Sequence, residues 1–302
     1  MTKQKIWLQQ SDRSLTTGRL QARASILTKH ISFEFFPPRD EPGQDKLVAN
    51  VAAKLASRNP QFFSVTYGAG GSTRDGTRQT VEALFGAGHQ AAPHLSMGND
   101  PLETLYQQVD EYKALGVSSI VALRGDQPSG VGGNRFANNA ENLVRAIRER
   151  YDDHFNLVVA AYPEVHPDGT SAAQDFDFFR RKVEAGASAA ITQYFYAPEA
   201  YYRFLDACAR HNISIPVIPG IMPITNAESL FRFSEKAGAD IPRWLRYALA
   251  DMTDESELVA FGVEVVTDLC ERLLSMGAPG LHFYTLNRWG ATSRICDNLN
   301  IS

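Results

Sequence analysis

Residues 171–211, SAAQDFDFFRRKVEAGASAAITQYFYAPEAYYRFLDACARH, contain one complete unit of the predicted fold. The segment Ser171–Ala185 has helical periodicity and is followed by Gly186, a residue type that commonly ends helices. The short apolar run Ala189–Tyr196 is typical of a buried strand, and Pro198 can begin a second helix. A strand that is apolar nearly throughout and lies between two helices favours parallel pairing with right-handed crossovers.

The same order of elements repeats along the chain. Seven further runs predict strands at Ile31–Pro37, Phe62–Gly68, Ala91–Met97, Ser118–Asp126, Leu157–Glu164, Ile215–Pro223 and Gly280–Asn287. Segments of helical periodicity separate them, for example Leu102–Leu115, which ends before Gly116. Eight strands that alternate with helices predict an α/β fold, a (β/α)8 TIM barrel that forms one domain over residues 1–302.

Additional helices are predicted between the seventh and eighth strands, at Asn226–Ala237, Arg243–Ala250 and Glu255–Met276. Residues 1–29 are predicted to be an N-terminal extension that contains a helix. An open, doubly wound sheet is disfavoured because the segment nearest to its dinucleotide fingerprint, Gly68–Thr73, lacks the third glycine.

Composition excludes several classes of protein. Hydrophobic residues make up 44% of the chain and charged residues 21%, values that are ordinary for a globular protein with a substantial core. A net charge of -4 provides no basic surface for nucleic acid, and no apolar stretch is long enough to span a membrane. The N-terminal segment is unlike a signal peptide, so we expect a cytoplasmic protein. Cys208, Cys270 and Cys296 are far apart, which predicts buried, reduced thiols.

Polar residues follow most of the predicted strands, where a barrel of this type carries its reacting groups. The candidates are Glu34, Thr66, Tyr67, His94, Arg124, Gly125, Asp126, Tyr162, Glu164, His166, Gln193, Asn287 and Arg288. A barrel with a purely structural role would not need so many polar residues at these positions.

Glu34 lies among aromatic residues in the run Ser32–Pro38, SFEFFPP, with no positive charge inside the run. A carboxyl that is desolvated in this way can keep its proton near neutral pH and act as a general acid. The alternative is a glutamate that reaches solvent or pairs with Arg39. Both interpretations are open from the sequence.

Other candidates also have structural alternatives. Asp126 either contacts a ligand next to Gly125 or forms an Asx turn, and His94 and His166 are either functional or simply hydrogen-bonded. The alternation in Glu164-x-His166-x-Asp168 is compatible with a divalent metal. Prolines at positions 163 and 167 disrupt regular geometry there, so we expect no metal site.

Eight motifs, taken in order, resemble those of the methylenetetrahydrofolate reductase family. They are SFEFFPP at 32–38, SVTYGA at 64–69, APHL at 92–95, VALRGD at 121–126, AAYPEVHP at 160–167, ITQYF at 191–195, PGIMP at 219–223 and FYTLNR at 283–288. Because the chain ends after one barrel, it resembles the short bacterial form rather than the longer eukaryotic enzymes. The resemblance implies a cytoplasmic oxidoreductase of one-carbon metabolism and methionine biosynthesis, which reduces 5,10-methylenetetrahydrofolate with NADH or NADPH and forms a homo-oligomer.

The resemblance also implies non-covalent FAD, which would explain the missing dinucleotide fingerprint. The implied FAD contacts are Tyr67, Ala69, His94, Arg124, Gly125, Asp126, Ala137, Tyr162, His166, Asp175, Arg181 and Lys182. The implied substrate contacts are Thr66, Gln193, Ser229, Phe233 and Arg288. Two positions depart from the family pattern: Ser229 stands where short relatives often have Gln, and Ala227 stands where they have Phe. The glycine-rich loop Gln127–Ala137 does not align cleanly, so the flavin contacts there are undetermined.

The implied mechanism gives two carboxyl groups opposite protonation states. A neutral Glu34 would protonate N10 of the folate and open its methylene bridge to an iminium cation, which then accepts hydride. An ionised Asp126 would stabilise that cation and influence the flavin potential. The nicotinamide and the folate would use the same site in turn, in a ping-pong reaction.

Three other functions are compatible with a barrel of this kind. A different flavin barrel, such as a proline dehydrogenase-like oxidase, would share FAD but need no folate. A metal-dependent aldolase or hydrolase would use Glu164, His166 and Asp168. A non-catalytic barrel would bind a small molecule without hydride transfer.

Overall fold

The computed structural model describes residues 30–67, 74–96, 101–124, 139–167, 169 and 171–301. In this part of the chain all strand pairs are parallel, in the order β7-β6-β5-β4-β3-β2-β1-β9-β8. The strands are β1 (His30–Phe35), β2 (Phe62–Val65), β3 (Ala91–Ser96), β4 (Ser119–Leu123), β5 (Asn156–Ala161), β6 (Ala189–Thr192), β7 (Val217–Ile218), β8 (Gly220–Ile221) and β9 (Gly280–Tyr284). The helices that alternate with the strands therefore connect neighbouring parallel strands, as the sequence predicted.

Strands β7 and β8 are two halves of one barrel strand, separated by Pro219. The first half pairs with β6 through Ile191–Ile218, and the second half pairs with β9 through Ile221–Phe283. At Pro219 the missing N–H removes a ladder donor, but its carbonyl still accepts a hydrogen bond from His282 N at 3.1 Å. This interrupted strand brings the two ends of the sheet together, and the predicted barrel with eight strand positions is confirmed.

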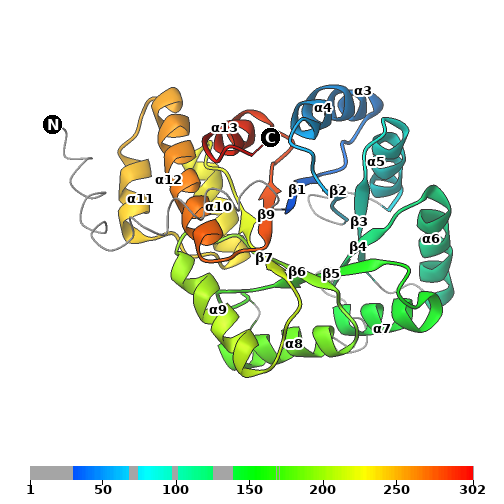
Figure 1. Ribbon diagram of the computed structural model, residues 1–302. Helices are drawn as coiled ribbons and strands as arrows, with labels where there is room; N and C mark the ends of the chain where they lie inside the picture. The colour runs from blue at the N-terminus through cyan, green and yellow to red at the C-terminus, as the bar shows by residue number, and fades with distance from the viewer. Residues whose placement is uncertain are drawn as a thin grey trace, which may run out of the picture.

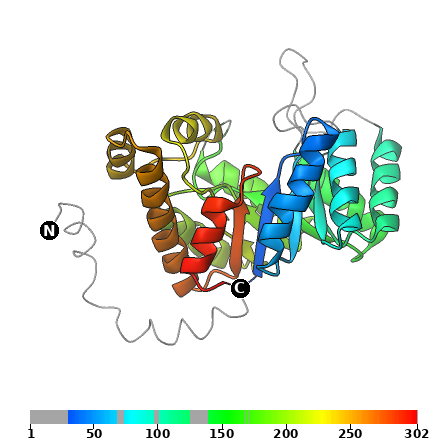
Figure 2. The ribbon, with the colours of Figure 1, turned by 90° about the horizontal axis from the view of Figure 1, so that it is seen from above.

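Helices form a ring around the strands, as Figure 1 shows. They are α3 (Glu41–Lys46), the π-helical η2 (Leu47–Ala52), α4 (Ala53–Ala56), α5 (Arg74–Gly86), α6 (Leu102–Leu115), α7 (Ala140–Tyr151), α8 (Ala172–Glu184), α9 (Pro198–Arg210), α10 (Ala227–Ala237), α11 (Arg243–Ala250), α12 (Glu255–Ser275) and α13 (Gly290–Asn298). Seen from above in Figure 2, α12 and α13 stand beside β9. The extra helices predicted between the seventh and eighth strands are thus present as α10, α11 and α12.

The helix boundaries agree with the local sequence signals. Helix α8 begins after Ser171, whose side chain accepts a hydrogen bond from Gln174 N, and α6 ends at Gly116 with a φ of 92°. The strands end earlier than predicted, because the polar residues that follow them leave the ladder and line a cavity. The N-terminal extension, residues 1–29, lies outside the described part of the chain. No helix within the described ranges is long and apolar enough to cross a membrane.

Consecutive side chains of each strand face opposite sides of the sheet, and the buried apolar residues therefore form two clusters. Side chains of one parity, such as the fully buried Phe33 and Phe35 of β1, pack between the sheet and the helices. Side chains of the other parity point into the barrel, where one cluster consists of Phe62, Ala92, Val121, Val158, Ala189 and Ile191. On the β9–β1–β3 side the inward positions are polar instead. This difference between the two sides of the barrel interior indicates where the site lies.

Candidate active site

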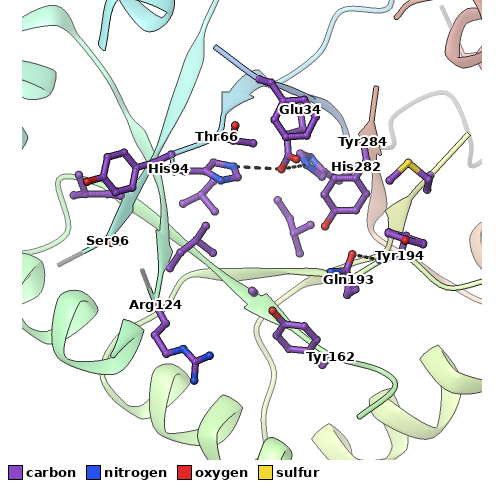
Figure 3. A pocket seen from close by; sticks show the side chains of 18 residues that line it. Glu34, Thr66, His94, Ser96, Arg124, Tyr162, Gln193, Tyr194, His282 and Tyr284 are labelled. Atoms are coloured by element: carbon purple, nitrogen blue, oxygen red, sulfur yellow. Dashed lines mark hydrogen bonds and ion pairs between the residues drawn. The ribbon is translucent and has the colours of Figure 1, made fainter. Parts of the chain in front are cut away.

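The barrel interior opens into a cavity of about 290 Å³ where the strands end. It is lined by Glu34, Phe36, Thr66, Tyr67, His94, Leu95, Ser96, Val121, Leu123, Arg124, Ala160, Tyr162, Ile191, Gln193, Tyr194, Met222, His282 and Tyr284. Figure 3 shows Glu34, His94 and His282 close together on one side of the cavity and Tyr162, Gln193 and Tyr194 on another. Seven of the candidates taken from the sequence therefore converge: Glu34, Thr66, Tyr67, His94, Arg124, Tyr162 and Gln193.

Two imidazoles flank the carboxyl group of Glu34. Its Oε2 lies 3.4 Å from His94 Nε2 and 3.7 Å from His282 Nε2, and its side chain is only 12% exposed (Figure 3). The backbone at this point is held by Thr285, whose hydroxyl donates to the Glu34 carbonyl at 2.7 Å. Glu34 is therefore fixed at the wall of the cavity and does not extend into solvent.

The surroundings of Glu34 differ from those that its neighbours in sequence indicate. Phe33 and Phe35 point away from the barrel, because consecutive residues of a strand face opposite sides. In register, Glu34 lies beside Ser64 of β2 and Tyr284 of β9. The carboxyl is partly buried as predicted, but imidazoles and a tyrosine border it, and the alternative pairing with Arg39 is not formed.

His94 is neutral at physiological pH. Burial lowers its pKa to about 4, an effect that the nearby charge of Glu34 opposes and that of His282 reinforces. His282 is held by Ser32, whose Oγ lies 2.7 Å from its Nδ1, so that Nε2 faces Glu34. One neutral imidazole and one imidazole that is fixed by Ser32 therefore border the Glu34 carboxyl.

Two hydroxyl groups at the cavity have no hydrogen-bond partner among the described residues. Thr66 Oγ1 and Ser96 Oγ are buried and unpaired, although buried polar atoms are rarely left so. Both residues belong to the lining of the cavity, together with apolar side chains such as Val121 and Ile191. A cavity with this mixed lining suits an amphipathic ligand whose polar atoms pair with the two hydroxyls.

Cationic residues lie at and below the same edge of the barrel. Arg124 lines the cavity and is exposed, whereas Lys182 donates from Nζ to the carbonyl of Ala160 at 2.5 Å. Burial lowers the pKa of Lys182 to about 8, with the Asp175 charge opposing this shift. Arg181 lies 3.2 Å from Asp177 Oδ2. Lys182 is therefore beneath the cavity wall, and Arg181 does not line the cavity.

The loop after β5 carries Tyr162, Glu164 and His166. The rings of Tyr162 and His166 pack edge to face with centroids 4.6 Å apart, and His166 N donates to Asp175 Oδ2 at 2.6 Å. Glu164 turns the other way and accepts a hydrogen bond from Asp240 N at 2.9 Å. Glu164 and His166 are thus bound to different elements, and the ranges that the structure describes contain no cluster of three potential metal ligands.

Three of the predicted substrate contacts lie outside the cavity lining. Phe233 on α10 is 37% exposed, Ser229 is half-buried on the same helix, and Arg288 is exposed after β9. Helix α10 is connected to the cavity through Tyr194, whose hydroxyl lies 3.1 Å from Ser234 Oγ. Four predicted residues, Ala69, Gly125, Asp126 and Ala137, lie outside the described ranges.

His282, Tyr284, Ser96 and Met222 line the cavity but were not predicted from the sequence. A signal for two of them was present: in the strand Gly280–Tyr284, the two polar residues stand two positions apart and share a face. Tyr284 donates to the carbonyl of Thr192 at 2.7 Å, and burial raises its pKa well above the usual value. The three cysteines are free and buried, as predicted.

Comparison with known proteins identifies similar sequences and folds. The profile of the family described as methylenetetrahydrofolate reductase matches residues 19–300. The 5,10-methylenetetrahydrofolate reductase of Escherichia coli (strain K12) is 38% identical over 274 residues, which are 90% of this chain and 91% of that protein. A probable methylenetetrahydrofolate reductase (NADH) of Oryza sativa subsp. japonica is 35% identical, and the match covers 94% of this chain but 50% of that longer protein. A solved protein from Clostridium thermocellum, described as binding two copies of 5-methyl-5,6,7,8-tetrahydrofolic acid, has a similar fold, with a TM-score of 0.64 at 18% identity. The match covers 94% of this chain and 99% of that protein, and it supports the barrel fold.

Proposed function

The chain belongs to the methylenetetrahydrofolate reductase family and has that enzymatic activity, and from this premise we propose that it works through non-covalent FAD with Glu34 as the general acid. The reaction converts 5,10-methylenetetrahydrofolate to 5-methyltetrahydrofolate at the expense of NADH or NADPH. The observation that carries the proposal is the carboxyl of Glu34, fixed in the cavity between two imidazoles.

The lining of the cavity supports the proposal of a flavin ring. Thr66 Oγ1 and Ser96 Oγ are buried without partners among the described residues, and a bound ring with polar edges would offer them partners. Bound FAD would supply a two-electron carrier that accepts hydride from the nicotinamide and passes it to the folate. The residues proposed to hold it in the described ranges are Tyr67, His94, Arg124, Tyr162, His166, Asp175, Arg181 and Lys182. Ala69, Gly125, Asp126 and Ala137 complete the proposed set by resemblance.

Glu34 is the group that would deliver a proton to N10 of the folate. The methylene bridge is a poor hydride acceptor until one of its C–N bonds opens, and protonation of N10 promotes that opening. The carboxyl of Glu34 lies at the wall of the cavity, 3.4 Å from His94 Nε2, where a bound folate would be within its reach. His282, held by Ser32, supports the carboxyl from the other side.

The remaining polar groups would bind and orient the substrates. Asp126 would stabilise the positive charge of the opened iminium form, and Gln193 and Thr66 would contact the folate and the nicotinamide from the cavity wall. Phe233, Ser229 and Arg288 would contact them from the rim. Because one cavity serves both substrates, we propose that they bind in turn, as a ping-pong reaction requires.

Anaerobic mixing of the FAD-loaded protein with each substrate tests this function. Reduction of the flavin by NADH or NADPH, followed by reoxidation with methylenetetrahydrofolate and formation of 5-methyltetrahydrofolate, is the expected result. Flavin that is reduced by proline, or that only oxygen reoxidises, would instead support a different flavin barrel.

A further inference from the structure

Helix α10 packs on the barrel along one face. Leu230 and Ser234 are buried and three further apolar side chains are partly buried against the core, whereas Phe233 and most of the polar side chains are exposed. One polar attachment is the contact of Ser234 Oγ with Tyr194 OH at 3.1 Å, close to the cavity. Polar contacts therefore supplement the apolar packing of this helix.

A second attachment joins the C-terminal end of α10 to the loop after β5. The N–H of Asp240 donates to Glu164 Oε2 at 2.9 Å. Next to it Gly238, with a φ of 67°, packs so closely that a Cβ there would lie 2.9 Å from Pro167 Cγ and 3.3 Å from the carbonyl oxygen of Val165. The loop and the end of the helix are thus in direct contact.

The other side of the same loop is fixed to α8. Asp175 accepts a hydrogen bond from His166 N at 2.6 Å, and a Cβ on Gly169 would lie 2.6 Å from the Asp175 carboxylate. The loop therefore has one side bound to α8 and the other side bound to α10. Glu164 supplies the polar contact on the α10 side.

Glu164 is suited to this contact because it is half-buried and charged groups surround it. Burial, together with the charge of Asp240, raises the pKa of Glu164 above its usual value, and the hydrogen bond from Asp240 N and the charge of Arg203 oppose this rise. Hydrogen bonds to an ionised acceptor are stronger than those between neutral groups. Loss of this acceptor would leave the Asp240 N–H without its partner and release the end of α10.

We infer that Glu164 is a positioning residue that fixes α10, and with it Phe233 and Ser229, against the loop that carries Tyr162 and His166. This inference rests on the proposed function, in which Phe233 and Ser229 contact substrate and Tyr162 and His166 contact the cofactor. Glu164 touches neither the reacting atoms nor the cavity. Its effect is on substrate affinity, through the distance between the helix and the loop.

The test compares Glu164→Ala, Glu164→Gln and Glu199→Ala in the FAD-loaded enzyme. Gln keeps an oxygen that can accept from Asp240 N, whereas Ala removes it; Glu199 forms an exposed ion pair with Arg272 at 3.0 Å, away from the site, and serves as the control. For Glu164→Ala we expect KM for methylenetetrahydrofolate to rise roughly three- to tenfold, as for loss of one ordinary hydrogen bond, with kcat within about twofold. Glu164→Gln and Glu199→Ala should keep the wild-type KM.

Amide hydrogen exchange supplies a readout that does not depend on activity. Exchange at residues 227–240 should be faster in Glu164→Ala than in wild type and unchanged in α5, while Glu164→Gln should resemble wild type. Faster exchange throughout the protein, unchanged exchange in α10, or a Gln variant that behaves like the Ala variant would overturn the inference. If the wild-type enzyme fails to reduce methylenetetrahydrofolate, the proposed function fails, while the exchange comparison still tests the attachment.

Discussion

At the scale of single residues, the position of Glu34 suits a proton donor for one of the two half-reactions. Its carboxyl lies against His94 and His282 at the cavity wall, where a substrate nitrogen could receive its proton. Hydride transfer from a nicotinamide to a flavin needs no protein acid, whereas opening of the folate bridge does. Glu34 should therefore matter to one half-reaction and not to the other.

We predict that Glu34→Gln separates these half-reactions. Reduction of the flavin by NADH or NADPH should persist within roughly an order of magnitude, and reoxidation by methylenetetrahydrofolate should slow by about 10² or more, as for loss of a general acid. Stopped-flow absorbance measures both rates, and Glu199→Gln on the outer surface is the matched control. Equal losses in the two half-reactions, or an unimpaired folate reaction, would show that Glu34 is not the acid.

His94 should make stability depend on pH. Its pKa is lowered to about 4 in the folded protein from about 6.5, so below the higher value the unfolded chain binds more protons than the folded one. Stability is therefore complete above about pH 6.5 and falls as the pH drops toward 4, by up to about 3 kcal/mol.

Urea denaturation at several pH values in this window measures the effect. His94→Gln, which cannot gain a proton, should show a smaller fall in the free energy of unfolding than wild type, and His154→Gln on the exposed loop before β5 should not. An identical pH dependence in wild type and His94→Gln would contradict the assignment.

At the scale of secondary-structure elements, the interrupted strand β7–β8 depends on a glycine. A Cβ on Gly220 would lie 2.1 Å from the Thr192 carbonyl oxygen and 2.6 Å from Tyr284 Cε2, so no side chain fits there. The N–H of the same residue donates to Thr192 Oγ1 at 2.9 Å. The close approach of β6, β8 and β9 at this point both closes the barrel and positions Tyr284 beside Glu34.

We predict that Gly220→Ala lowers the free energy of unfolding by about 1–3 kcal/mol or more, because overpacking at this junction forces the strands apart. Gly86→Ala is the matched control: it lies at the end of α5 with no atom within 4 Å of the added Cβ, and alanine favours helix. Urea denaturation should show Gly86→Ala as stable as wild type or slightly more so. If Gly220→Ala left the free energy of unfolding unchanged, the strands could separate at this junction without a loss of stability, and the prediction would be wrong.

At the scale of the whole molecule, the barrel brings polar, aromatic and apolar groups from several strands to one cavity. Arg124 lines this cavity, and Lys182 lies beneath its wall, where it donates to the carbonyl of Ala160. The homo-oligomeric state and the cytoplasmic location are also properties of the whole molecule, and both stay predictions. Gel filtration with light scattering would measure the oligomeric state.

We predict that the purified protein is yellow and releases FAD, not FMN, on denaturation. The reason is the set His94, Arg124, Asp175 and Lys182, to which the proposed function assigns contacts with both ends of FAD. Chromatography of the released flavin gives the answer, with reconstitution of any colourless protein as the control. FMN alone, or no flavin after reconstitution, would contradict the prediction.

Local signals in the sequence were sufficient for the fold class and for most of its elements. Apolar runs, helix ends such as Gly116 and the motifs around Glu34 act over a few neighbouring residues, and for that reason they could be interpreted without a structure. The same signals identified the polar residues after the strands, of which Glu34, Thr66 and His94 meet in the cavity.

Only the tertiary structure decided what surrounds those residues. Ser32 and His282 are 250 positions apart, and closure of the barrel pairs their strands and places the imidazole against Glu34. Strand alternation turns Phe33 and Phe35 away from the same carboxyl, because the face that points inward depends on how the sheet closes. Burial, pKa and partner choice arise from contacts between distant segments, and these are set by packing of the whole barrel rather than by adjacent residues.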